Sequence, residues 1–277
     1  MAKNRFSSFK RKSENYWGLF KLIGKSFYRN PRGPLFLYIV PVFFLVLFYF
    51  VLGNGMDNAG KVSLLSSYLL LPGLTILTSL APAIVEWKNS VFLKRIDSTG
   101  VNKSLFLLAL WSFYFLVGLS GIFFQFLIAL ALGNKIFIEH LPTIQWGYFI
   151  LGVFYTIILA IAIATLLGGL FSNEGVMQGL TMMIYFLSIF LSGIMLYPTL
   201  YETSEFIRIF TYLIPQKYAS FLILMAQDVK GLAGEFNNAN PNHQDFTAVW
   251  QLIVGGLLFI IFFFVITNFT FKWTAKR

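Results

Sequence analysis

The sequence predicts an all-α integral membrane protein with six transmembrane helices, an N-terminal amphipathic interfacial helix, and re-entrant helices between the fifth and sixth spans. Of the 277 residues, 57% are hydrophobic and only 12% are charged, whereas soluble domains have about 45–50% and 25%. Six apolar segments contain no Asp, Glu, Lys, Arg or His, and each approaches or exceeds the roughly 20 residues that a helix needs to cross a bilayer. Between the last two lies a stretch of intermediate polarity.

Residues 1–33 are predicted to form a cytoplasmic tail that contains an amphipathic helix over Glu14–Arg29. Apolar residues recur along this segment at helical spacing, and basic residues form a ridge four positions apart. Such a helix lies in the membrane interface with its apolar face in lipid, and a role as topology anchor is the simpler interpretation. The apolar positions are Tyr16, Phe20, Ile23 and Phe27, and the basic positions are Lys21, Lys25 and Arg29.

Residues 34–277 are predicted to form one six-span membrane domain. Pro72 and Pro82 interrupt the second span and are expected to kink it. The third span is longer than a bilayer requires, so we expect it to tilt or protrude. The predicted spans are Pro34–Leu52, Val62–Val85, Ser104–Leu132, Trp146–Phe171, Val176–Leu196 and Val249–Thr270.

The extracellular segment 198–227 is too polar for a seventh crossing and too apolar for a solvated loop. Apolar residues continue past Pro198, break at Pro215, and then resume. This pattern predicts helices that dip back into the outer leaflet, which is tolerated where protein or a water cavity covers the backbone. Only 231–245, rich in Gly, Asn and Pro, has the composition of an ordinary exposed loop.

Lys and Arg are distributed unevenly between the two sides of the predicted spans. The side that holds the termini and loop 86–103 has sixteen of the 21, and the opposite side has five. Because cytoplasmic loops carry the excess of Lys and Arg, both termini are expected in the cytoplasm and the spans in the plasma membrane. The net charge of +10 therefore indicates attraction to anionic membrane lipid and not binding of nucleic acid.

The cytoplasmic loop 86–103 is predicted to be helical from Trp87 to Ile96. A helix tied rigidly to two spans can press into a groove on a soluble partner. The alternative is an interfacial turn held by basic side chains that reach toward water. Val91, Phe92 and Ile96 are expected to share an apolar face, with Lys88, Lys94 and Arg95 exposed.

Several kinds of chemistry are excluded by what the spans and loops lack. There is no cysteine, and the two histidines lie in separate loops, so no thiolate or His-based metal site is expected. Gly24-Lys25-Ser26 is not a phosphate loop, because five residues separate Gly18 from Gly24 where that motif has four. Spans without carboxylates or histidines disfavour an intramembrane protease and a proton- or sodium-coupled carrier.

Small and polar residues within the spans predict helix packing. Ala160, Ala164 and Gly168 form a ridge on the fourth span, and Ser188 with Ser192 forms a shorter one on the fifth. Small residues at this spacing let helices approach closely, so packing within the chain is expected, with a subunit interface as the alternative. Gln125, the amide deep in the third span, is expected to form an interhelical hydrogen bond rather than to contact substrate.

Together these features resemble the membrane subunit of an ABC exporter of the type-2 class, the family of drug, antibiotic and polysaccharide export permeases. Two local matches carry the resemblance, Glu86 to Val101 and Leu191 to Pro215. The first is similar to the family pattern of a Glu at the end of the second span, a basic-apolar pair and a Thr-Pro-Val-like step, with Gly100 in place of the proline. Through its layout the resemblance extends over nearly the whole chain.

The resemblance implies a transporter subunit and not an enzyme, with a cognate ABC ATPase subunit and a second permease copy, identical or different, as partners. ATP and magnesium would bind the ATPase, so no cofactor is expected on this chain. The substrate class is amphiphilic, lipid-like, drug or glycan, and a carrier or channel without ATPase subunits, or a scaffold or sensor, is the alternative. The implied ATPase contacts are Glu86, Trp87, Val91, Phe92, Arg95 and Ile96, braced by the interfacial helix.

Overall fold

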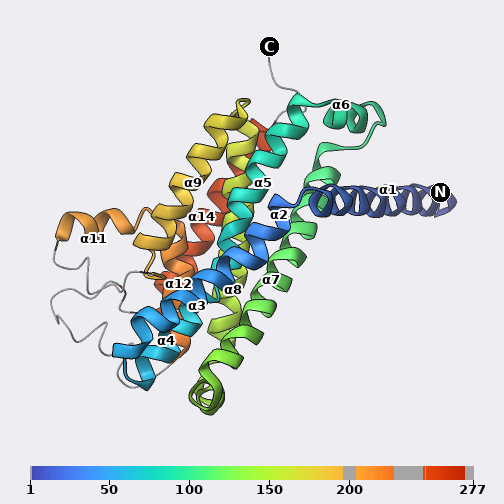
Figure 1. The fold of residues 1–277 in the computed structure, drawn as a ribbon. Helices are drawn as coiled ribbons and strands as arrows, with labels where there is room; N and C mark the ends of the chain where they lie inside the picture. Colours follow the sequence, from blue (N-terminus) through green and yellow to red (C-terminus); the bar gives the residue numbers. More distant parts are fainter. Residues whose placement is uncertain (1, 196–203, 228–245, 247, 272–277) are drawn as a thin grey trace.

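All regular structure in the computed structural model, which describes residues 2–195, 204–227, 246 and 248–271, is helical. Within these residues six segments are long and apolar enough to cross a membrane, and a bent helix pair lies between the fifth and sixth (Figure 1). The fold class predicted from the sequence is therefore confirmed. The six segments are Arg32–Gly55, Gly60–Asn89, Lys103–Thr143, Trp146–Leu170, Glu174–Leu191 and Val249–Thr270.

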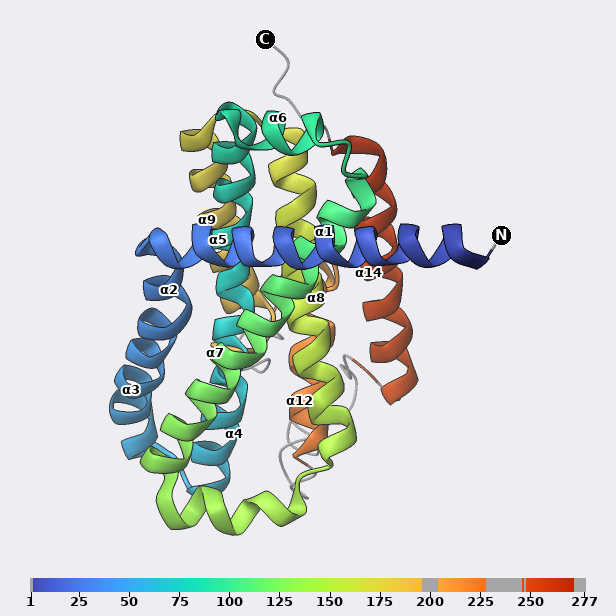
Figure 2. The same cartoon turned by 90° about the vertical axis from the view of Figure 1, so that its right-hand side faces the viewer.

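The N-terminal helix α1 (Ala2–Arg29) crosses the bundle instead of running along it (Figure 2). It leads through the short helix α2 (Arg32–Pro34) and a π-helical turn (Leu35–Ile39) into α3 (Val40–Leu52). The wide turn ends two residues before Pro41, which has no N–H to donate to the carbonyl four positions earlier.

The second span consists of α4 (Asn58–Tyr68) and α5 (Leu71–Asn89). The break between them precedes Pro72, which has no N–H to donate to the Tyr68 carbonyl four positions earlier. The fully buried Gln125 Nε2 donates to that carbonyl at 3.2 Å and to the Pro41 carbonyl at 3.1 Å. The interhelical role predicted for this amide is confirmed, whereas Pro82 lies inside α5 without ending it.

Replacing Gln125 with Leu should lower the stability of the bundle. The Tyr68 carbonyl, to which Pro72 cannot donate, and the Pro41 carbonyl would lose their shared donor, and interhelical hydrogen bonds in membranes contribute about 0.6–2 kcal/mol. The expected result is a lower thermal unfolding midpoint of the detergent-solubilised chain. The control is Gln178→Leu, because Gln178 is exposed on α9, and an equal midpoint for both variants would contradict the role of Gln125.

The third span, α7 (Lys103–His140), has 38 residues and is broken at Asn134, whose φ is 41°. Its last turns run across the end of the bundle (Figure 2), so the length beyond a bilayer crossing is accommodated by a change of direction. Positive φ is uncommon for a residue other than glycine, although Asn adopts it more often than most.

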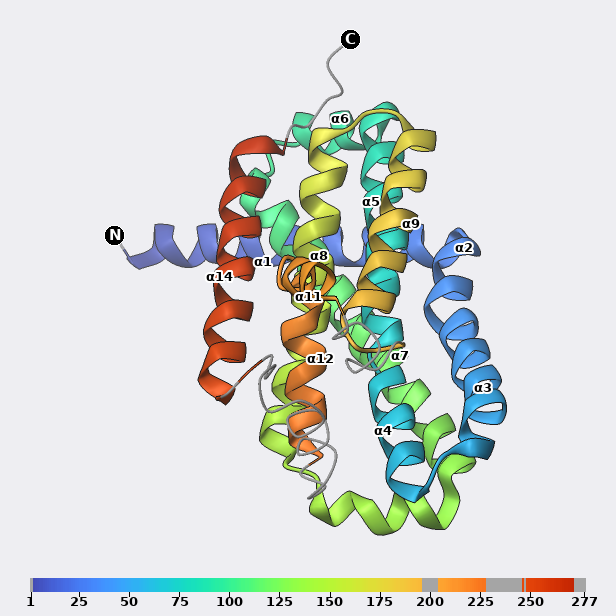
Figure 3. The same ribbon diagram turned by 90° about the vertical axis from the view of Figure 1, so that its left-hand side faces the viewer.

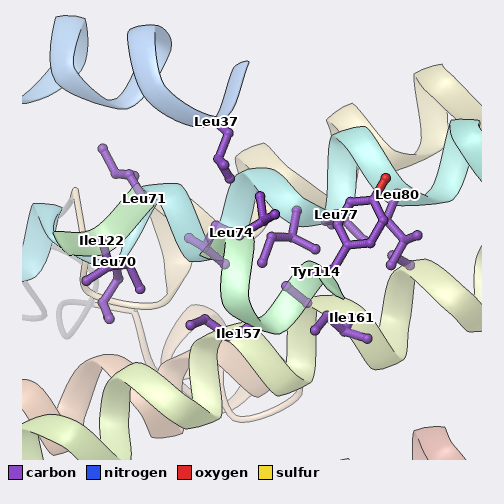
Figure 4. Packing of buried hydrophobic residues seen from close by; sticks show 14 of the residues in the cluster. Leu37, Leu70, Leu71, Leu74, Leu77, Leu80, Tyr114, Ile122, Ile157 and Ile161 are labelled. Carbon is purple, nitrogen blue, oxygen red and sulfur yellow. The ribbon is translucent and has the colours of Figure 1, made fainter. Parts of the chain in front are cut away.

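The core lies between α5 and α8 (Trp146–Leu170). These are the most buried spans of the described chain, at 78% and 67% of their apolar windows, and Leu74, Leu77, Ile157 and Ile161 meet between them (Figure 4). The small-residue ridge of α8 faces this contact, because a Cβ on Gly168 would lie 2.8 Å from Ile84 Cβ. Packing within the chain, predicted for that ridge, is therefore confirmed.

The bent pair comprises α11 (Glu205–Thr211) and α12 (Pro215–Ala226), which meet at 93°. α12 packs against α8 and α14 (Val249–Thr270) (Figure 3). It also contacts α9 (Glu174–Leu191), where the Ser188 hydroxyl donates to Gln216 Oε1 at 3.1 Å. Residues 198–203 of the predicted re-entrant segment 198–227 lie outside the described residues. The whole predicted loop 231–245 lies outside them as well.

Lys217 is buried inside the bent pair. From the sequence it was predicted only to lie on the extracellular side of the spans. Its Nζ donates to Thr211 Oγ1 at 2.6 Å and lies 4.2 Å from the centre of the Tyr212 ring. Hydrogen bonding and a cation–π contact offset part of the cost of burying the charge. The side chain thereby ties the end of α11 to the start of α12.

Candidate functional site

The segment between the second and third spans lies across one end of the bundle (Figure 2). α5 ends at Asn89, and a new helix, α6 (Val91–Ser98), begins after Ser90, whose Oγ accepts from the Phe92 N–H at 3.2 Å. The prediction of one helix from Trp87 to Ile96 is wrong on this point. A serine in extended conformation ends the span and caps the next helix, so Trp87 belongs to the span.

α6 turns one face toward the bundle and the other toward solvent. Leu93 and Ile96, three positions apart, share the buried face, whereas Val91 is 58% exposed and Arg95 is exposed. Phe92 is half-buried, with its ring 5.3 Å from that of Trp87. The predicted common face for Val91, Phe92 and Ile96 is wrong, because residues five apart on a helix point in different directions.

Lys88 anchors the start of this segment. It was predicted to be exposed but is only 3% exposed. Its Nζ donates to the carbonyls of Gly168 (3.0 Å), Gly169 (2.8 Å) and Phe171 (2.9 Å) at the end of α8. These carbonyls lie in the last turn of a helix or just beyond it, where acceptors lack intrahelical donors and the macrodipole favours a cation. The prediction was therefore wrong, because the charge of Lys88 is used to cap another span.

Lys103 anchors the other end of the segment. Its Nζ donates to the Asn268 carbonyl at 2.7 Å and lies 5.6 Å from the centre of the Phe271 ring, so it contacts the last turn of α14. Between α6 and Lys103 the chain turns at Gly100, whose φ is 70°. Proline cannot adopt this conformation, so the turn requires the Gly100 that replaces the family's proline.

The first two residues of the predicted ATPase contact differ in how exposed their side chains are. Glu86 is exposed, whereas Trp87 is 6% exposed and its Nε1 donates to Ser26 Oγ of α1 at 3.3 Å. Trp87 therefore joins the end of the second span to the N-terminal helix. Ser26 belongs to the false phosphate-loop motif and lies within α1.

The predicted apolar face of α1 packs on protein. Ile23 and Phe27 are buried, and the Phe27 ring lies 5.7 Å from the Phe113 ring of α7. The Tyr16 hydroxyl hydrogen-bonds Ser112 Oγ at 2.6 Å. The expectation that this face lies in lipid is therefore wrong. Phe20 is half-buried beside Phe113, Leu19 joins the buried face, and the predicted basic positions Lys21 and Lys25 are exposed.

A groove of about 720 Å³ separates α1 from α6. Glu14, Gly18 and Leu22 line it from α1, and Phe92 and Arg95 line it from α6. A second cavity of about 730 Å³ adjoins it between the C-terminal part of α1, α2, α5 and α9, and Leu22 and Phe92 line both. Residues predicted to meet a partner subunit thus gather around one continuous hollowed surface.

The sequence did not reveal the two lysine anchors. Both residues flank apolar spans, where a lysine usually extends its amine toward water. One signal was present, since the fourth and sixth spans end without a basic residue in the last turn. A cation from elsewhere in the fold can stabilise such an end, but only the structure shows which cations do so.

Comparison with known proteins places these features in one family. A family model described as ABC-2 family transporter protein matches residues 52–268. The matched range includes α6, the bent pair, the second to fifth spans and nearly all of the sixth. No curated protein and no solved structure gave a significant match.

Proposed function

The chain belongs to the ABC-2 transporter family, and on this premise we propose that it is the permease of an exporter driven by a separate ATPase subunit. As a permease of an ABC transporter it is a multi-pass membrane transport subunit and not itself an enzyme. In the proposal, ATP and magnesium bind the ATPase, and closure of two ATPase subunits moves two permease subunits to open a path outward. No cofactor is assigned to this chain.

The observation that carries the proposal is the way in which α6 and its flanking residues are attached to the membrane spans. Its outer face presents Val91 and Arg95, whereas Ile96 is buried beneath it. Lys88 and Lys103 fasten the two ends of the segment to α8 and α14. A force applied to α6 by a soluble partner would therefore reach the fourth and sixth spans directly. Trp87 and Ile96, both predicted as contacts, are placed to support α6 from within.

The proposed orientation puts the α6 end in the cytoplasm of a cell whose plasma membrane the spans cross, with both termini on that side. The excess of Lys and Arg near this end supports it. The first, fifth and sixth spans are only 17%, 28% and 11% buried within the described chain. Their apolar faces are available to membrane lipid and to a second permease copy, the remaining proposed partners.

Replacing Phe92 and Arg95 together with Ala should weaken binding of the cognate ATPase subunit by about tenfold or more, because truncation of an aromatic and an arginine anchor commonly costs over 1 kcal/mol each. The measurement is affinity between the purified full-length chain in nanodiscs and the ATPase. The matched control is Phe206→Ala with Lys135→Ala, since both residues are exposed and lie outside α6. The thermal midpoint of both variants reports folding.

Two outcomes would count against the proposal at different levels. Normal complex formation by the Phe92/Arg95 variant would show that these two residues do not contribute to the contact with the ATPase. If the unaltered chain neither binds the ATPase nor changes its hydrolysis rate, the ATP-driven exporter is wrong, and a carrier, channel or scaffold remains.

A further inference from the structure

The 730 Å³ cavity is lined by charges of both signs on different elements. Lys25 and Arg29 of α1 and Arg32 of α2 contribute the cations. Glu86 at the end of α5 and Glu174 at the start of α9 contribute the carboxylates. Cations and carboxylates therefore line one cavity but come from separate parts of the fold.

These opposite charges do not neutralise one another in the described part of the chain. Within it, no ion pair joins the three cations to Glu86 or Glu174. One Glu174 oxygen accepts from Asn89 Nδ2 at 3.3 Å, which fixes the carboxylate without cancelling its charge. Opposite charges that face a common space without pairing leave room for a ligand with two charges of its own.

The remaining lining of the cavity mixes apolar residues with uncharged polar ones, among them Thr78, Ser79 and Gln178. Phe36 follows α2 toward the first span, Ala83 lies on α5, and Met182 lies on α9. Phe36 and Met182 belong to two of the least buried spans of the described chain, which would adjoin lipid. The lining therefore combines a charged region near the cytoplasmic end of the spans with an uncharged, partly apolar region that continues along them.

We infer that this cavity binds the headgroup of a zwitterionic amphiphile that carries a phosphate and a primary ammonium group. Arg29 and Arg32 supply planar donors that match phosphate oxygens, and Glu86 and Glu174 accept from the ammonium. The acyl chains lie against the apolar lining. This inference deepens the proposed exporter and rests on it for the claim that the bound amphiphile is cargo.

Ligands with one charge fit the lining less well. A purely anionic headgroup would leave Glu86 and Glu174 without a cation beside its own negative charge, and a purely cationic one would meet three basic side chains. Like charges at close range disfavour both complexes. The volume is within the 300–1,000 Å³ of ordinary small-molecule sites, so it accommodates a headgroup and the first part of the chains.

The test measures lipid binding to the purified full-length chain by native mass spectrometry, with no ATPase present. The probes are phosphatidylethanolamine, phosphatidylglycerol, which lacks the ammonium, and diacylglycerol, which lacks the phosphate as well. We expect phosphatidylethanolamine to bind roughly fivefold more tightly than phosphatidylglycerol, which corresponds to about 1 kcal/mol, and diacylglycerol to bind most weakly.

Two double variants test the contribution of the cations and that of the carboxylates separately. Arg29→Gln with Arg32→Gln should weaken both phospholipids, whereas Glu86→Gln with Glu174→Gln should weaken phosphatidylethanolamine alone and remove the preference. Lys21→Gln and Glu139→Gln are matched controls, because both side chains are exposed and do not line the cavity. Equal binding of the two phospholipids, or variants that bind as the unaltered chain does, would overturn the inference.

A second measurement separates this inference from the proposed function. If phosphatidylethanolamine is cargo, it should stimulate ATP hydrolysis by the assembled permease–ATPase complex, and the Arg29/Arg32 variant should require more lipid for the same stimulation. If the chain binds phosphatidylethanolamine selectively but does not change ATP hydrolysis by the ATPase, the exporter is refuted and the lipid site is supported. A working complex without lipid selectivity would refute the lipid site alone.

Discussion

Replacing Lys88 with Met should reduce transport far more than it reduces ATPase binding. The side chain is buried beneath the start of α6, and its amine donates to three carbonyls at the end of α8. Met has a similar length but no donor and no charge. Movement of α6 would then no longer pull on the fourth span through these bonds. The measurement is transport per ATP hydrolysed in proteoliposomes that contain the permease and its ATPase.

The same substitution should also destabilise the bundle, because a buried acceptor left without a donor costs about 1–3 kcal/mol. The Phe171 carbonyl lies beyond the helix end and can recruit water, so the expected total is roughly 2 kcal/mol. In a protein of this size that corresponds to a thermal midpoint lower by several degrees.

The matched control is Lys94→Met, which removes an exposed cation from α6. We expect that variant to keep its thermal midpoint and its transport per ATP. If Lys88→Met retains transport per ATP when ATPase binding is saturated, the anchor supports folding only, and the force passes through another contact.

Strong local signals made the spans and the interfacial helix predictable. Long runs without charge can only be helices in a bilayer, and the amphipathic spacing of Tyr16, Phe20, Ile23 and Phe27 fixed the inner face of α1. What covers that face was not predictable, because an apolar helix face packs equally well on lipid or on Phe113. The amphipathic pattern records hydrophobicity and does not identify the neighbour.

The errors in the site have the same physical origin. Lys88 and Lys94 look alike in sequence, since both follow the predicted end of the second span at Val85, yet one is buried and the other exposed. The difference comes from the end of α8, a segment some eighty positions away along the chain. Gln125 was predicted correctly because a lone amide in an apolar span must find a partner, whereas a basic residue at the membrane boundary need not.

Replacing Gly152 with Val should displace the re-entrant helix α12 from the fourth span. A Cβ at this position would lie 2.9 Å from the Ala219 carbonyl oxygen and 2.8 Å from Ile223 Cγ1. The carbonyl belongs to the backbone of α12, so it cannot rotate away as a side chain would. Overpacking of a core usually costs about 1–3 kcal/mol. Because the contact here is with backbone, we expect the cost of this substitution to be at or above the upper end of that range.

The chain has no cysteine, so a single introduced thiol can report the position of α12. Ala226, fully buried at the end of α12, is replaced with Cys and tested with a maleimide. The thiol should stay unreactive in the otherwise unaltered chain and react when Gly152→Val is added. Gly147→Val is the matched control on the same helix, because a Cβ there meets nothing within 4 Å. Equal labelling of the two valine variants would show that the position of α12 does not depend on close approach at Gly152.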